Sequence, residues 1–236
     1  MTTKLRLSHI HLRVRSIKRA VADFEQAGFR VEWGRNPKRS PNAFIWFNDA
    51  VFIELFTMLP PTALASPFLS RRYGPEMRAR WDFWRGKEEG LLDFAVEAED
   101  PGMARIERFE AVRSQIEADG IRLSRSWYGS RVNPRGERVE YAFSGLMPVE
   151  LPFLVSTFNI PQIPDHIDHP NGIDHIRHLY VTCASELMEP MQRVICGDPK
   201  IVLEPGERTA IRAIAFAGGD APLPAGLLHG MVVADR

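Results

Sequence analysis

An internal repeat constrains the fold of this chain more than any other feature of its sequence. Residues 24–31 and residues 116–123 match in residue type at most positions, and each stretch runs from a helical pattern through a glycine into apolar residues. Glycine directly after a periodic apolar pattern predicts the end of a helix. The sequence therefore predicts two copies of one unit in which a strand follows a helix.

The first copy, residues 1–59, predicts the order β-α-β-β-β. Residues 8–14 are typical of a strand, Ser16 is suited to cap a helix, and that helix is expected to end at Gly28. Three further strands are expected at residues 29–33, 43–47 and 51–56.

The second copy, residues 91–160, repeats this order, and residues 173–236 predict a third, looser and partial copy of βαβ type. Expected elements of the second copy are a strand at residues 92–96, a helix around residues 106–116, and strands at residues 123–130, 138–143 and 153–158. The third is expected to hold a strand, a helix and a hairpin near residues 176–183, 186–195 and 204–207. We therefore expect an α+β fold of tandem βαβββ modules.

Two segments fall between these modules. Residues 60–90 are rich in proline, arginine and aromatic residues, and residues 77–84 predict a short helix that carries Trp81 and Trp84. A connection of this length is typical of a lid or docking element, or of an insertion packed outside the sheet. Residues 161–172 form a second linker, rich in proline.

Charge and composition exclude several classes of partner. Thirty basic residues balance thirty acidic ones over 236 residues, so no overall field attracts nucleic acid or an anionic membrane. No signal peptide or membrane-spanning run is visible, and a cytoplasmic protein with a small-molecule ligand is expected. Cys183 and Cys196 are expected to be buried thiols rather than a disulfide.

Potential metal ligands lie on the first and last strands of the first module. His9 and His11 alternate with apolar residues on the first strand, and Glu54 does so on the last. If the two strands are neighbours, an imidazole and a carboxylate converge. His9 and Glu54 could then bind a metal or substrate, or form a hydrogen-bonded pair on a half-buried sheet face.

Several strings, in this order along the chain, resemble the vicinal oxygen chelate superfamily and, more narrowly, its glyoxalase-like domain proteins. They are the His-Ile strand at residues 9–10, the Ile-Glu-Leu strand at residues 53–55, a Gly-Ser-Arg turn before a Pro-x-Gly hairpin at residues 129–136, and residues 151–154 and 169–172. The resemblance implies paired modules in a cupped, mostly antiparallel sheet that holds a divalent metal. Known members include lyases, isomerases, dioxygenases and metal-free drug-binding proteins, so the fold does not assign a function.

The resemblance implies that His9 and Glu54 are metal ligands. A mixed nitrogen and oxygen set suits Fe(II), Mn, Ni, Co or Zn. The matching positions of the second module offer no complete ligand set, which leaves Asp93, His169 or His175 as candidates for a third ligand.

Other residues are assigned to the substrate. His11 and Arg131 are expected to orient it as catalytic residues, although a filler role for His11 and a surface position for Arg131 are equally consistent with the pattern. The expected substrate-binding residues are Trp46, Phe52, Phe56 and His169, with a turn-stabilising role as the alternative for His169.

Three functions are consistent with these patterns. The favoured one is a metal-dependent enzyme, of lyase, isomerase or dioxygenase type, that acts on a small substrate with two adjacent oxygens. The second is a metal-free protein that binds a small molecule in the same cup. The third is an interaction module whose sheets pair two copies, and a homodimer is compatible with all three.

Overall fold

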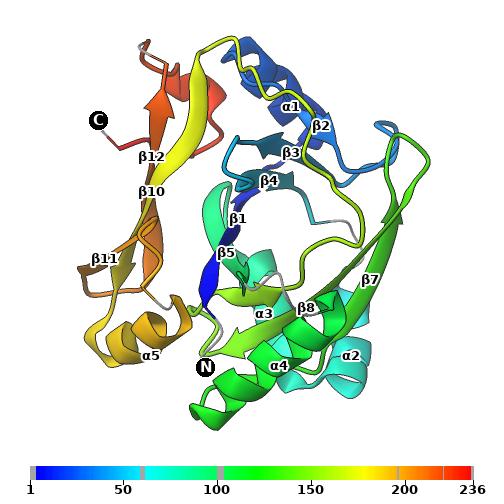
Figure 1. Ribbon diagram of the computed structural model, residues 1–236, viewed down its shortest axis with the longest axis vertical. Helices are drawn as coiled ribbons and strands as arrows, with labels where there is room; N and C mark the ends of the chain where they lie inside the picture. Colours follow the sequence, from blue (N-terminus) through cyan, green and yellow to red (C-terminus); the bar gives the residue numbers. More distant parts are fainter. Residues whose placement is uncertain (1–3, 59–61, 100–103, 196, 220, 235–236) are drawn as a thin grey trace.

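The computed structural model describes residues 4–58, 62–99, 104–195, 197–219 and 221–234 (Figure 1). Its elements are β1 (Leu5–Arg13), α1 (Ile17–Gln26), β2 (Glu32–Trp33), β3 (Asn42–Trp46), β4 (Phe52–Phe56), α2 (Thr62–Tyr73), α3 (Pro75–Gly86), β5 (Gly90–Ala98), α4 (Arg105–Ala118), β6 (Arg122–Leu123), β7 (Trp127–Val132), β8 (Arg138–Met147), β9 (Phe153–Val155), β10 (Ile173–Cys183), α5 (Ser185–Ile195), β11 (Ile201–Pro205), β12 (Ala210–Gly218) and the short helix η1 (Ala225–Leu227). The predicted α+β fold is confirmed.

The first two modules share one mixed sheet, whose strands follow the order β2-β3-β4-β1-β5-β9-β8-β6, with β7 paired to β8. In each module the last strand lies parallel to the first, β4 beside β1 and β9 beside β5. The two modules meet where β1 and β5 pair in antiparallel orientation. This arrangement brings His9 and Glu54 onto adjacent strands.

The repeated sequence segments end their helices in the same way. After α1, the N–H of Gly28 donates to the carbonyl of Glu25 and the next residue bonds back to Phe24; after α4, Gly120 and its successor form the equivalent bonds. Both glycines have φ of +82°. This is the Schellman motif, which favours glycine because a Cβ penalises a left-handed backbone.

A bulge in β1 decides which of its side chains face the site. Leu5 and Leu7 belong to the hydrophobic core, as do Ile10 and Leu12, so the alternation changes parity between residues 7 and 10. The pairing with β5 shifts register at the same point, between Leu7 and His9. Because a bulge adds one residue to a strand, His9 and His11 come to lie on the face opposite the core.

The third unit forms a separate sheet of β11, β10 and β12 beside the first (Figure 1). Here the strand that directly follows the helix, β11, pairs parallel with β10, whereas the first two modules use their last strand for that pairing. Phe216 of β12 packs against Phe29 and Phe47, with ring centroids 5.9 and 5.7 Å apart. The unit thus covers the core face of the large sheet, and the predicted domain boundaries stay predictions.

The insertion after β4 folds into α2 and α3, and a buried arginine attaches α3 to the large sheet. Arg80 has no exposed surface. It donates to Oδ2 of Asp93 at 2.7 Å and to the carbonyls of Leu146 and Leu151. Because Asp93 and both carbonyls belong to the second module, the insertion becomes part of the wall of that module rather than an outer appendage.

Two sequence predictions concern the rest of the chain. No helix among the described residues is long and apolar enough to cross a membrane. Cys183 is buried and its thiol is free, whereas Cys196 lies outside the described residues.

Candidate metal and substrate site

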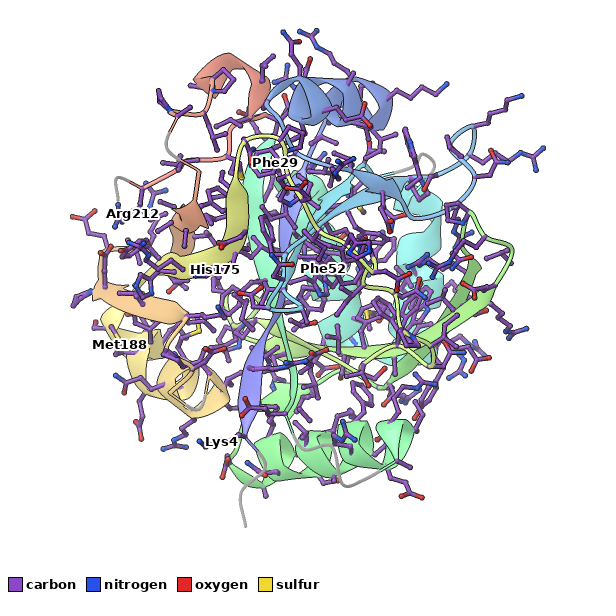
Figure 2. The ribbon with its side chains drawn as sticks, turned by 45° about the horizontal axis from the view of Figure 1, so that its top comes forward. Lys4, Phe29, Phe52, His175, Met188 and Arg212 are labelled. Carbon is purple, nitrogen blue, oxygen red and sulfur yellow. The ribbon has the colours of Figure 1, made fainter. Side chains whose placement is uncertain are left out.

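A cavity of about 580 Å³ opens on the face of the large sheet opposite the hydrophobic core. Figure 2 shows Phe52, one of its lining residues, among the side chains at the centre of the molecule. Aromatic rings form much of the wall, among them Phe44, Trp46, Phe52, Phe56, Phe153 and Phe158. Three of the predicted substrate-binding residues, Trp46, Phe52 and Phe56, therefore line one cavity.

His9, His11 and Glu54 converge at this cavity. Their potential ligand atoms lie within 4.8 Å of one another. The Nε2 atoms of the two histidines are 3.3 Å apart, and Oε2 of Glu54 lies 3.7 Å from His9 Nε2 and 3.4 Å from His11 Nε2. His11, expected as a substrate contact, thus stands where a third ligand would.

These separations fit one divalent ion. Two ligand atoms that each lie about 2.1 Å from an ion are separated by about 3.0 Å at a right angle and about 3.4 Å at the tetrahedral angle. The 3.3 and 3.4 Å distances already lie in this range, and the 3.7 Å distance between His9 and Glu54 needs only a small contraction to reach it. Two imidazoles and one carboxylate on a single face, with further positions open, are the donor set of many mononuclear metal enzymes.

Burial and neighbouring charges prepare these groups to bind a cation. Burial, assisted by the adjacent His11, lowers the pKa of His9 to about 3, which keeps its imidazole neutral near pH 7. Burial opposes ionisation of Glu54, but contacts with His11, His9 and the amide of Asn42 lower its pKa to about 2. Metal binding requires neutral histidine and ionised carboxylate, so both groups already hold the needed charge state.

Neighbouring polar groups orient two of the three candidate ligands. The amide of Asn42 donates to Oε1 of Glu54 at 2.8 Å, which leaves Oε2 directed at the imidazoles. Nδ1 of His9 lies 3.3 Å from the hydroxyl of Ser8, which itself donates to Glu97 at 3.1 Å. Such contacts fix the tautomer and ring orientation of metal-binding histidines.

The described residues of the second module add no ligand to this cluster. Asp93, a candidate from the sequence, is instead an acceptor for Arg80 and for the indole of Trp84, at 2.7 and 2.6 Å. The sequence could not show that Asp93 is already paired, because its partner Arg80 belongs to the insertion and not to the second module. His175, a further candidate, is part of the β10 sheet and pairs with Asp174. Among the described residues, only the first module supplies the cluster.

His169 does not line the cavity, contrary to its predicted place at the rim. Its Nδ1 accepts a hydrogen bond from the backbone N–H of Arg30 at 2.9 Å, so its Nε2 donates to the carbonyl of Trp46 at 3.0 Å. The ring packs between Phe29 and Phe47, and burial lowers its pKa. His169 therefore connects the linker to the first module by two hydrogen bonds. This structural role corresponds to the turn-stabilising alternative.

Arg131 lines the cavity from β7. The Gly-Ser-Arg string, expected as a turn, is part of this strand, and the turn lies at residues 133–136. A Cβ on Gly129 would lie 2.6 Å from the ring of Tyr141 on the paired strand. Glycine is therefore needed because the tyrosine ring lies across it, while Arg131 is 6% exposed rather than a surface residue.

Other lining residues were not singled out from the sequence. Asn42, Trp127 and Gln162 are such residues, whereas Trp81 and Trp84, which the sequence placed on the helix of the insertion, line the cavity as well. Strand alternation could have identified two of them: Asn42 is two residues from Phe44, and Trp127 is four residues from Arg131. No sequence pattern marks Gln162, which follows the last strand of the second module.

Comparison with known proteins places this geometry in a family. Residues 7–191 match the glyoxalase-like domain family. No curated protein sequence matches the chain. A hypothetical protein from Staphylococcus aureus superposes with a TM-score of 0.66 at 13% identity, over 90% of each chain.

Two solved enzymes share the fold at low identity. A Mn(II)-bound glyoxalase from Novosphingobium aromaticivorans superposes with a TM-score of 0.52 at 12% identity, over 92% of this chain and 66% of that one. For an extradiol ring-cleaving dioxygenase from B. fuscum the TM-score is 0.50 at 8% identity, over 91% of this chain and 57% of that one. Because this family match spans residues 7–191, the chain belongs to the glyoxalase-like domain family.

Proposed function

We propose that the protein is a divalent-metal-dependent enzyme that acts on a small organic substrate with two adjacent oxygens. The convergence of His9, His11 and Glu54 within 4.8 Å carries this proposal. Solved proteins of the same fold include a Mn(II)-bound glyoxalase and a ring-cleaving dioxygenase, which supports a metal-dependent reaction of lyase, isomerase or dioxygenase type.

A divalent ion in this site would act as a Lewis acid that polarises two adjacent substrate oxygens and stabilises the negative charge developing on them. The residues of the chain prepare the place for it. His9 and Glu54 present a neutral nitrogen and an ionised oxygen, and the Asn42 amide holds the carboxylate in one orientation. The donor set suits Fe(II), Mn, Ni, Co or Zn.

The cavity wall suits a substrate with an apolar or aromatic body. The ring of His9 stacks on Phe52 with centroids 4.5 Å apart, and His11 lies 4.8 Å from Phe153. These rings exclude water from the imidazoles, which strengthens every electrostatic interaction at the cluster.

A second candidate function is metal-free binding of a small molecule. It is favoured by the contribution of the second module, which lines the cavity with apolar Phe143, Phe153 and Val155. Its carboxylate on the wall, Glu97, is already paired with Arg6. Under this proposal the three polar residues would form a buried hydrogen-bonded cluster that contacts the ligand directly.

The metal content of the purified full chain distinguishes the two functions. Protein prepared in air and anaerobically is analysed together with His9→Ala, His11→Ala, Glu54→Ala and, as a matched control, His175→Ala in the third unit. The enzyme proposal expects about one ion per chain in the native protein and the control, and little in the other variants. Absence of metal in both preparations, with no change in melting temperature when divalent ions are added, would contradict it.

A further inference from the structure

Arg131 is a buried cation that no described carboxylate neutralises at ion-pair distance. It is 6% exposed. It donates to the backbone carbonyl of Gly34 and, at 3.1 Å, to Oε1 of Gln162, both of which are neutral acceptors. A guanidinium carries five N–H donors. Among the described residues, two acceptors therefore serve five donors.

The surroundings of Arg131 stabilise its charge only in part. The guanidinium carbon lies 5.0 Å from the ring centroid of Phe44 and 5.6 Å from that of Phe158. Such cation–π contacts are favourable but accept no in-plane hydrogen bond. Burial accordingly lowers the pKa of Arg131. A buried charge is costly until a counter-ion and hydrogen-bond acceptors are supplied, and a ligand in the cavity can supply both.

Strand pairing fixes where this cation lies relative to the metal cluster. Phe44 on β3 is the direct cross-strand partner of Glu54 on β4, and the side chains of such partners stand side by side on one face. The guanidinium of Arg131 faces the ring of Phe44. About one aromatic ring therefore separates the guanidinium from the carboxylate of the cluster.

The charges of the site favour an anionic ligand once an ion is bound. The other cation of the wall, Arg6, is already paired with Glu97 at 2.7 Å. A divalent ion, the Glu54 carboxylate and the Arg131 guanidinium together leave about two positive charges in a largely apolar cavity. A neutral substrate would leave this excess uncompensated.

We propose that the substrate is an organic acid whose carboxylate binds Arg131 while two adjacent oxygens, about one aromatic ring away, face His9, His11 and Glu54. This inference rests on the proposed function for the placement of the oxygens. The binding of the carboxylate to Arg131 does not rest on that function. It follows from the position of Arg131 on β7 beside Phe44 on β3. The planar guanidinium matches a carboxylate with two parallel N–H···O bonds, and the flanking rings suit an aromatic body.

A matched pair of ligands tests the proposal on Mn(II)-loaded full-length protein. The probes are 3,4-dihydroxybenzoate and 3,4-dihydroxybenzamide, which share their shape and their adjacent hydroxyls and differ in charge. Quenching of tryptophan fluorescence measures their dissociation constants. We expect the acid to bind about tenfold more tightly or better, because a charge-assisted bidentate pair is stronger than a neutral hydrogen bond.

Variants assign that preference to Arg131. We expect Arg131→Gln to bring the acid-to-amide ratio near one and Arg131→Lys to restore part of it. Arg138→Gln, which alters an exposed arginine of the neighbouring strand β8 paired with Glu140, is expected to leave the ratio unchanged. Thermal unfolding of each variant verifies the fold, and the comparison of acid with amide on the native chain needs no variant.

The outcomes separate this inference from the proposed function. Equal affinities for acid and amide on the native chain, binding of neither, or a preference that persists in Arg131→Gln would each overturn the carboxylate site. If the native chain binds no Mn(II) but still prefers the acid through Arg131, the metal-dependent function fails while the carboxylate site is supported.

Discussion

The side-chain amide of Asn42 donates a 2.8 Å hydrogen bond to Oε1 of Glu54 and thereby leaves the other carboxylate oxygen for the two imidazoles. This contact depends on Gly34, because a Cβ there would clash with the Asn42 side-chain oxygen. The carboxylate of the candidate metal site is thus positioned by a strand neighbour rather than by its own backbone.

Loss of the Asn42 amide should weaken metal binding without unfolding the protein. We expect Asn42→Leu to lower the affinity for Mn(II) about 10- to 100-fold, the usual effect of removing a group that orients a metal ligand. Competition with a chelator of known affinity measures the change. Asn48→Leu, an exposed position in the turn after β3, is the control and should keep native affinity. Unchanged affinity in Asn42→Leu would show that the carboxylate needs no such support.

Burial of His9 makes the metal-free protein sensitive to acid. The unfolded chain protonates His9 below a pKa of about 6.5, whereas the folded chain does so only near 3. Stability attributable to this group is therefore fully present above pH 6.5 and lost as the pH falls toward 3. Between pH 7 and pH 5 the loss should be about 2 kcal/mol. Urea unfolding at both pH values measures it, and a loss just as large in His9→Gln would refute the assignment.

The buried pair of Arg80 and Asp93 should dominate the attachment of the insertion. Arg80→Ala leaves the Asp93 carboxylate buried without its cation, and we expect it to cost about 3–5 kcal/mol of unfolding free energy. Arg78→Ala, two residues earlier on the exposed side of α3, should change stability by less than about 1 kcal/mol. Denaturant unfolding of both variants provides the comparison, and similar losses would contradict the anchoring role of Arg80.

Gly129 should tolerate no side chain. A Cβ at this position meets the Tyr141 ring at 2.6 Å, so the ring must move into the cavity or the strands must separate. We expect Gly129→Ala to cost about 1–3 kcal/mol and to weaken ligand binding. Gly86→Ala has open space around its Cβ and should be neutral or slightly stabilising. Melting temperatures and ligand titrations measure both effects, and a neutral Gly129→Ala would contradict the packing argument.

Local patterns predicted the elements of this fold well where they specify the backbone directly. Gly28 and Gly120 end their helices because both need a left-handed conformation. His9 and Glu54 lie on the first and last strands of one module, and the pairing of β1 with β4 brings them together. Periodicity and turn chemistry contain this information.

Contacts between distant segments could not be read from the sequence. Nothing in the sequence near Asp93 indicates that it forms an ion pair with Arg80 of the insertion. Nothing near His169 indicates that its two ring nitrogens form hydrogen bonds with the backbone of Arg30 and Trp46. The bulge before His9 likewise results from the register with β5. Each of these outcomes depends on tertiary packing that overrides local pattern.

The unequal contributions of the two modules have a consequence for how such a protein can diversify. The three candidate ligands lie between residues 9 and 54, whereas Trp127, Arg131 and Phe143 of the second module line the same cavity. Substitutions in the second module can therefore alter which molecule is accepted while the donor atoms stay untouched. Under the proposed function, the described residues of the first module would supply the donor atoms, whereas both modules would shape the wall that contacts the substrate.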